Sequence, residues 1–160
     1  MGRHSGLGTA LLIGMLMCVS CGSSPESPTA AGADPDVTTR GNLEVTARLA
    51  EVPEGAIFKR ELYNYATVLK YQVLQVHRGE WSGGTLYVGH YNPFKPRAEA
   101  ADQRIKDVGG NLKAFRAGQV HRMALAGPID ENYMGGIVNK YFGQDTGTIH
   151  WAVWTNLVSD

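Results

Sequence analysis

The chain has 160 residues, 43% of them hydrophobic, and its 15 basic and 15 acidic side chains give a formal net charge of zero. This length suits one globular domain with appendages. A chain without net charge has no field that attracts nucleic acid, so we expect no nucleic-acid partner. Twenty glycines, many of them in turn-like pairs, favour short strands joined by tight turns over a helix bundle.

Residues 1–20 have the pattern of a secretory signal, with a short basic start and an apolar run that is too short to anchor the chain stably in a bilayer. The segment Val19-Ser20-Cys21 resembles the lipobox of bacterial lipoproteins, in which a small residue precedes the cysteine that is lipidated. Cys18 departs from that pattern, because a leucine is typical at its position. The resemblance implies export and a lipid anchor on Cys21. Gly22 is similar to the signal for sorting to the outer membrane, facing the periplasm.

The alternative is an ordinary cleaved signal with two cysteines near its end. Under both interpretations no cysteine remains in the folded domain, so we expect no disulfide and no thiolate metal site there. Residues 21–41 are rich in Ser, Pro, Ala, Gly, Thr and Asp, which predicts a flexible tether. The domain then comprises residues 42–160.

The first strand of this domain is predicted over residues 43–49, where apolar and polar residues alternate. The segment from Tyr65 to Tyr91 predicts two further strands that face each other across a polar turn. Within it the alternation changes parity after Val73, which predicts a β-bulge between Val73 and Leu74. Small closed barrels use such bends to turn a corner.

Prolines interrupt the strand pattern after Tyr91, and residues 97–107 predict a short helix. Strand character returns at residues 119–126 and 148–156. The sequence therefore predicts a mainly β fold: a small, OB-like antiparallel barrel of five to six strands, with one short helix in the insertion before strand four. Trp151 and Trp154 are expected on opposite faces of the last strand. The predicted core includes Val73, Val76, Val88, Leu125 and Trp151.

The run VLKYQVLQVHRG, a second strand and the later pair Ala117-Gly118 resemble OB-fold and netrin-like barrels of secreted proteins. This resemblance covers residues 43–126 and implies shape rather than chemistry. The phrases HYNPFKPR, FRAGQVHRMAL and HWAVWT are similar to uncharacterised envelope proteins linked to exopolysaccharide modification or export. That similarity implies an accessory role connected with polysaccharide.

Residues for nucleophilic catalysis are scarce. After residue 41 the serines are Ser82, in a predicted turn, and Ser159, near the end of the chain, which argues against an esterase. The chain has neither a phosphate-binding loop nor a dinucleotide fingerprint, so we expect no cofactor. Four histidines lie at or near predicted strands: His77, His90, His121 and His150. None forms a short-spaced pair, and ordinary strand histidines are the commoner interpretation, but His90 and His121 are the weak candidates for a metal site.

The loop that follows the third strand carries the candidate binding residues Tyr91, Phe94, Lys95 and Arg97. Two prolines fix much of its backbone, so its side chains are held ready at low entropic cost. Arg97 and Lys95 suit acidic groups, and Tyr91 and Phe94 suit stacking, as an acidic or acetylated polysaccharide or an acidic protein surface requires. The alternative is structural: Arg97 pairs with Asp102 or Glu99, and Phe94 closes the end of the barrel.

Two functional classes remain. The first is a lipid-anchored binding or accessory protein of the cell envelope, with polysaccharide or an envelope protein as its partner. The second is a small periplasmic hydrolase or metal-dependent enzyme that uses His and acidic side chains. The lack of a structured nucleophile, of a metal-binding signature and of clustered acidic residues favours the first.

Overall fold

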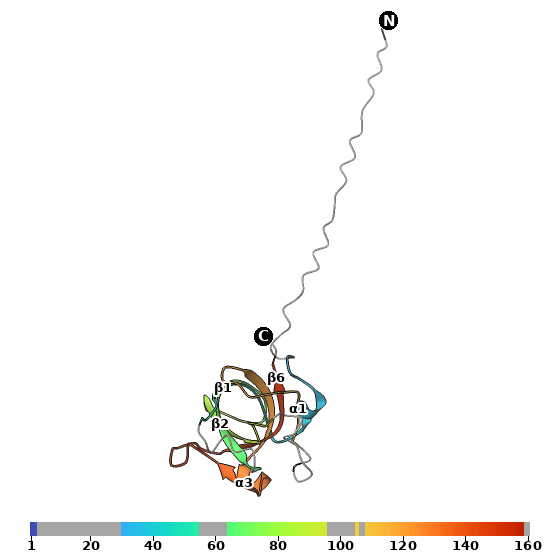
Figure 1. Ribbon diagram of the computed structural model, residues 1–160. Helices are drawn as coiled ribbons and strands as arrows, with labels where there is room; N and C mark the ends of the chain where they lie inside the picture. Colours follow the sequence, from blue (N-terminus) through green and yellow to red (C-terminus); the bar gives the residue numbers. More distant parts are fainter. Residues whose placement is uncertain (3–29, 55–63, 96–104, 106–107, 159–160) are drawn as a thin grey trace.

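Five strands close into a barrel in the computed structural model, which describes residues 1–2, 30–54, 64–95, 105 and 108–158 (Figure 1). The barrel strands are β1 (Leu43–Glu51), β2 (Ala66–Arg78), β3 (Thr85–Tyr91), β4 (Val120–Ala126) and β6 (His150–Leu157). They follow one another around the barrel as β1–β2–β3–β6–β4, and β4 returns to β1. A short sixth strand, β5 (Ile137–Val138), pairs with the start of β2. The predicted mainly β barrel is confirmed.

Two of the strand pairs are parallel, β3 with β6 and β2 with β5, so the barrel is not antiparallel throughout. The long connection between β4 and β6 allows β6 to run in the same direction as β3. This connection also holds a short helix, α3 (Ile129–Asn132), and a second one, α1 (Pro35–Thr39), precedes β1. The helix expected over residues 97–107 lies outside the described residues, apart from Ile105.

The predicted bulge in β2 is confirmed by its pairing with β1. Thr46 pairs with Gln75 and Ala47 pairs with Val73, so Leu74 is the extra residue. Its side chain is 48% exposed. Because of this insertion, residues on both sides of the bulge pack against the barrel interior: Tyr71 and Val73 before it, and Val76 after it.

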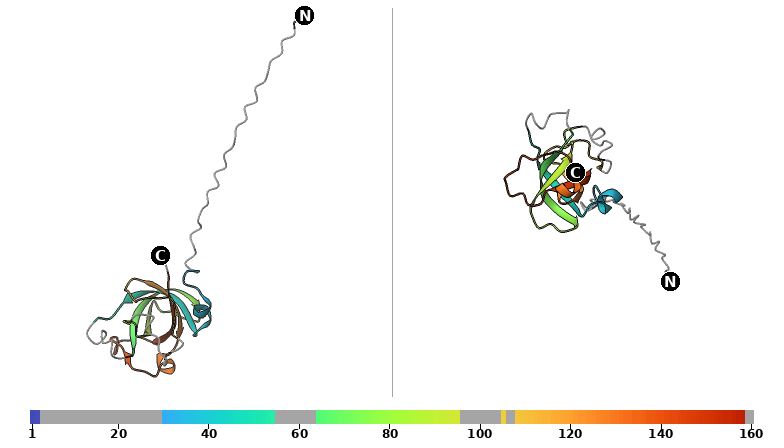
Figure 2. Two further views of the ribbon diagram at one scale, coloured as in Figure 1. Left: turned by 45° about the vertical axis from the view of Figure 1, so that its right-hand side comes forward. Right: turned by 90° about the horizontal axis from the view of Figure 1, so that it is seen from below.

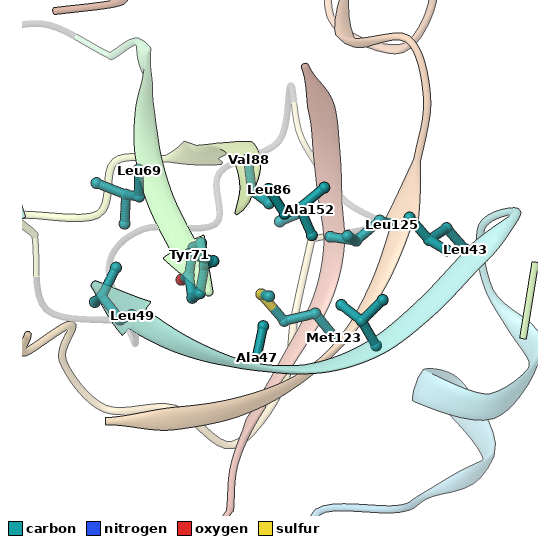
Figure 3. Close-up of a cluster of buried hydrophobic side chains, with 11 residues drawn as sticks. Leu43, Ala47, Leu49, Leu69, Tyr71, Leu86, Val88, Met123, Leu125 and Ala152 are labelled. Carbon is teal, nitrogen blue, oxygen red and sulfur yellow. The ribbon is translucent and has the colours of Figure 1, made fainter. Parts of the chain in front are cut away.

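The barrel interior is filled by one cluster of buried side chains from all five strands (Figure 3). Its members are Leu43, Val45, Ala47, Leu49, Leu69, Tyr71, Leu86, Val88, Met123, Leu125 and Ala152. Of the predicted core, Val88 and Leu125 belong to this cluster, and Val73 and Val76 are half-buried against it. Trp151 is also buried, but in a second cluster that lies outside the barrel wall.

Both tryptophans of β6 lie on the outer face of the barrel. Trp154 pairs with Ala124 while Ala152 pairs with Leu125, so Val153 is an extra residue that changes the parity of the strand. The expectation of one ring on each face is therefore wrong. Trp151 stacks on Tyr133, with ring centroids 4.5 Å apart and planes 14° apart.

Residues 30–41 pack against the barrel, and α1 covers the outer face of β4 and β6 (Figure 2). Asp34 caps α1 by accepting a hydrogen bond from the Val37 amide at 2.8 Å. It also accepts hydrogen bonds from Trp154 Nε1, at 3.2 Å, and from Asn156 Nδ2. The side chain of Val37 is fully buried. The folded part therefore begins before residue 42, so residues 30–41 of the segment predicted to be a tether belong to the packed structure.

Candidate functional site

A groove of about 410 Å³ lies between the end of β3 and the segment that follows α3. The described residues that line it are Asn64, Tyr91, Ile105, Asn132, Tyr133, Met134 and Gly135. None of these carries a charged side chain. Tyr91 and Tyr133 contact each other edge to face at 6.0 Å, and Tyr133 is held in turn by the stack on Trp151. The aromatic wall of the groove is thus fixed by the second hydrophobic cluster.

The loop after β3 is bound to the segment before β2, and this places Asn64 at the groove. The Tyr65 amide donates to Asn92 Oδ1 at 3.3 Å, and Asn92 Nδ2 donates to Asn64 Oδ1 at 2.9 Å. Asn92 has a positive φ of 44°, a conformation that asparagine tolerates better than most residues. Lys95 Nζ donates to the same Asn64 oxygen at 2.7 Å, so its ammonium group lies next to the groove.

The structure brings two of the four predicted binding residues to this groove. Tyr91 forms part of its wall with only 2% of its surface exposed, and Lys95 lies beside it through Asn64. Phe94 is 37% exposed and is not among the lining residues. Arg97 lies outside the described residues.

Six of the seven described lining residues were not predicted from the sequence: Asn64, Ile105, Asn132, Tyr133, Met134 and Gly135. One signal for three of them was present in the sequence. Asparagine stands next to tyrosine at Asn64-Tyr65, Tyr91-Asn92 and Asn132-Tyr133, and these three pairs meet around one groove.

The two histidines singled out in the sequence also come together, inside the barrel. Tyr71 Oη lies 3.0 Å from His90 Nε2 and 3.1 Å from His121 Nδ1. All three side chains are at most 1% exposed. Phe115 packs against both imidazole rings, with centroid distances of 4.6 Å to His90 and 5.6 Å to His121. We call these residues the His–Tyr–His chain.

Hydrogen bonds outside the His–Tyr–His chain determine which of its atoms donate and which accept. The Arg116 amide donates to Gln119 Oε1 at 2.8 Å, which settles the orientation of that carboxamide. His121 Nε2 lies 3.4 Å from the same oxygen, which can only accept, so Nε2 carries the proton. His121 Nδ1 therefore accepts from the Tyr71 hydroxyl, and Tyr71 accepts from His90 Nε2. Burial lowers the pKa of His121 to about 4, in keeping with a neutral ring.

The other two histidines lie elsewhere. His77 Nε2 is 2.7 Å from Thr46 Oγ1, and burial lowers the pKa of His77. His150 contacts the Trp81 ring edge to face at 5.4 Å. Within the described part of the chain, no three His, Cys, Asp or Glu side chains are grouped so that they could hold a metal ion.

Among the described residues, no helix has both the length and the apolar character needed to cross a bilayer. No protein-family model matches the chain, and no curated protein or solved structure matches it.

Proposed function

We propose that this protein is a lipid-anchored binding module of the bacterial cell envelope that holds polysaccharide in the groove beside α3. The observation that carries this proposal is the lining of the groove, in which the described residues combine the carboxamides of Asn64 and Asn132 and the exposed side chain of Met134 with the buried rings of Tyr91 and Tyr133. Sugars present hydroxyl groups that pair with carboxamides, and C–H faces that pack on apolar and aromatic side chains. The interior of the barrel is filled by its own side chains, so the ligand is bound outside it.

The position of the groove supports this role. The described N-terminal segment starts at the carboxyl end of β6, where Asn156 Nδ2 donates to the Gly32 carbonyl at 2.7 Å. Helix α3 packs at the opposite end of β6, where the Ile129 amide donates to the Ile149 carbonyl at 2.8 Å (Figure 1). A chain anchored through Cys21 would thus hold the groove on the side away from its point of attachment.

A second candidate function is the small periplasmic hydrolase or metal-dependent enzyme. The convergence of His90 and His121 is the observation that favours it. However, Tyr71 already supplies a hydrogen-bond partner to both rings, so the geometry is explained without a metal. Stoichiometric retention of Zn²⁺ by the purified protein, lost in His121→Gln, would favour the enzyme.

The proposed anchor predicts the outcome of labelling with radioactive fatty acid. The wild-type protein should incorporate the label, and Cys21→Ala should not, because Cys21 follows the lipobox-like segment Val19-Ser20. Cys18→Ala is the matched control and should be labelled normally. Label that persists in Cys21→Ala and disappears in Cys18→Ala would show that Cys18 carries the lipid, and would contradict the assignment to Cys21.

The proposed ligand predicts that the domain of residues 30–160 is retained on immobilised polysaccharide from the cell envelope. The double variant Asn132→Ala, Met134→Ala should lose at least about tenfold in affinity, since it removes one polar and one apolar contact from the groove. Both side chains are exposed, so the variant should remain folded. Phe142→Ala, which removes an equally exposed apolar side chain outside the groove lining, should bind as the wild type does. Equal retention of the double variant and the wild type would refute the groove as the binding site.

A further inference from the structure

The two methionines of residues 30–160 differ completely in their access to solvent. Met123 is fully buried in the barrel interior, whereas Met134 is 92% exposed and lines the groove beside α3. We infer that Met134 is a site of reversible oxidation, and that its conversion to methionine sulfoxide weakens ligand binding in the groove. This inference rests on the proposed function, because it names a form of regulation for that same groove.

The side chain of Met134 carries the sulfur atom that an oxidant in solution can reach. Residues 30–160 contain no cysteine, so their sulfur atoms are those of Met123 and Met134. Met123 is enclosed by the buried side chains of all five barrel strands. Oxidation of a thioether requires contact between the sulfur and the oxidant, and exposure therefore directs the reaction to Met134.

The neighbours of Met134 hold its backbone at the groove. The Tyr133 amide donates to the Ile129 carbonyl at 2.8 Å, and the Tyr133 ring stacks on Trp151. On the other side of Met134, a Cβ atom added to Gly135 would lie 2.3 Å from the Tyr133 hydroxyl, so these two residues are in close contact. None of these contacts involves the Met134 side chain, and they persist when its sulfur is oxidised.

A peroxide is the class of oxidant that the reaction requires. The thioether sulfur attacks one oxygen of hydrogen peroxide, so that the O–O bond breaks, an S–O bond forms and the sulfur loses two electrons. The second oxygen leaves as hydroxide and takes up the proton of the transferred oxygen, which reduces the peroxide to water. In the reverse direction a dithiol supplies two electrons and two protons, becomes a disulfide, and releases the sulfoxide oxygen as water.

Oxidation changes the contact that Met134 offers to a ligand. The thioether is apolar and polarisable, and it packs well against the C–H face of a sugar. The sulfoxide carries a strongly hydrated oxygen, and covering that oxygen with a C–H face removes its water. The oxidised groove should therefore bind its ligand less tightly than the reduced groove.

The test treats the full chain, purified from cells, with hydrogen peroxide and locates the added oxygen by peptide mass spectrometry. Met134 is expected to be oxidised at least about tenfold faster than Met123, because Met123 reacts only when the barrel opens. Retention on immobilised envelope polysaccharide should then fall at least about threefold relative to the untreated protein. Treatment with a methionine sulfoxide reductase and a dithiol should restore it.

Two variants separate Met134 from other targets of peroxide, and each is compared with its own untreated form. Met134→Leu has no thioether at the groove, so peroxide should not change its retention. Met123→Leu is the matched control: it keeps the exposed methionine and should lose retention on oxidation as the wild type does. Leucine and methionine have similar volumes, so this core substitution is well tolerated.

The possible failures are distinguishable. Oxidation of Met123 ahead of Met134, or equal retention before and after Met134 is oxidised, would overturn the inference and leave the proposed function standing. A loss of retention in peroxide-treated Met134→Leu as large as that of the wild type would also overturn it, because another residue would then carry the effect. If the untreated wild type is not retained, the proposed function fails and the inference fails with it.

Discussion

Replacing Trp151 by alanine is expected to lower the free energy of unfolding by about 3–5 kcal/mol. Trp151 is 5% exposed, and its ring stacks on Tyr133 at 4.5 Å within the cluster that also holds Tyr91 and Ile129. Truncation leaves a cavity between the barrel wall and α3, and the rings around it lose their packing. Urea unfolding followed by circular dichroism measures the change.

Phe142→Ala is the control for Trp151→Ala. Phe142 is 90% exposed, so its removal should change stability by no more than about 0.5 kcal/mol. A loss below about 1 kcal/mol in Trp151→Ala would show that this ring is not buried in solution. Loss of polysaccharide retention in a folded Trp151→Ala protein would further connect the second cluster with the groove.

Acidification from pH 7 to pH 4 is expected to remove about 3 kcal/mol of stability through His121. The folded-state pKa of His121 is lowered by burial from 6.5 to about 4, so between these values the unfolded chain binds the proton more tightly. Stability therefore falls as the pH drops through this window, and it is fully present above the unfolded pKa. Protonation would also remove the acceptor that the Tyr71 hydroxyl uses.

His121 can be followed directly by an NMR titration of its ring, which should give a pKa near 4. A pKa of 6 or above would contradict the buried, neutral ring. Urea unfolding at several pH values gives a second measurement: His121→Gln should lose much less stability on acidification than the wild type. His77→Gln is the matched control and should keep most of the acid dependence, because His77 is only half-buried.

The sequence was most informative where a change in the alternation of apolar and polar residues marks a β-bulge. The parity change after Val73 is visible in the order of apolar residues, and it identified the bulge at Leu74. In β6 the apolar residues continue to alternate through Trp151 and Val153, so the sequence does not show that Val153 is an extra residue in the pairing with β4. Its position depends on pairing with β4, which is a tertiary property.

The packed N-terminal segment and the groove could not be predicted from the sequence, because both depend on contacts between segments that are far apart along the chain. Asp34 finds its partners Trp154 and Asn156 about 120 residues further along the chain, and its own neighbourhood has the composition of a linker. The groove likewise joins Asn64, Tyr91 and Asn132, which come from three separate segments. By contrast, His90 and His121 were identified by position on their strands, while their link through Tyr71 follows from the need of a buried hydroxyl for a partner.

The central claim is that saccharide binds in the groove beside α3, and its most direct test is a two-dimensional ¹H–¹⁵N NMR titration of the 30–160 domain with N-acetylglucosamine trimer. We expect saturable shifts at the side-chain amides of Asn64 and Asn132 and at the backbone amides of Tyr91 and residues 133–135. The turn around Trp81, which lines a separate surface hollow, should stay unchanged. Shifts that cluster at Trp81, or a spectrum that does not change at millimolar trimer, would contradict the claim.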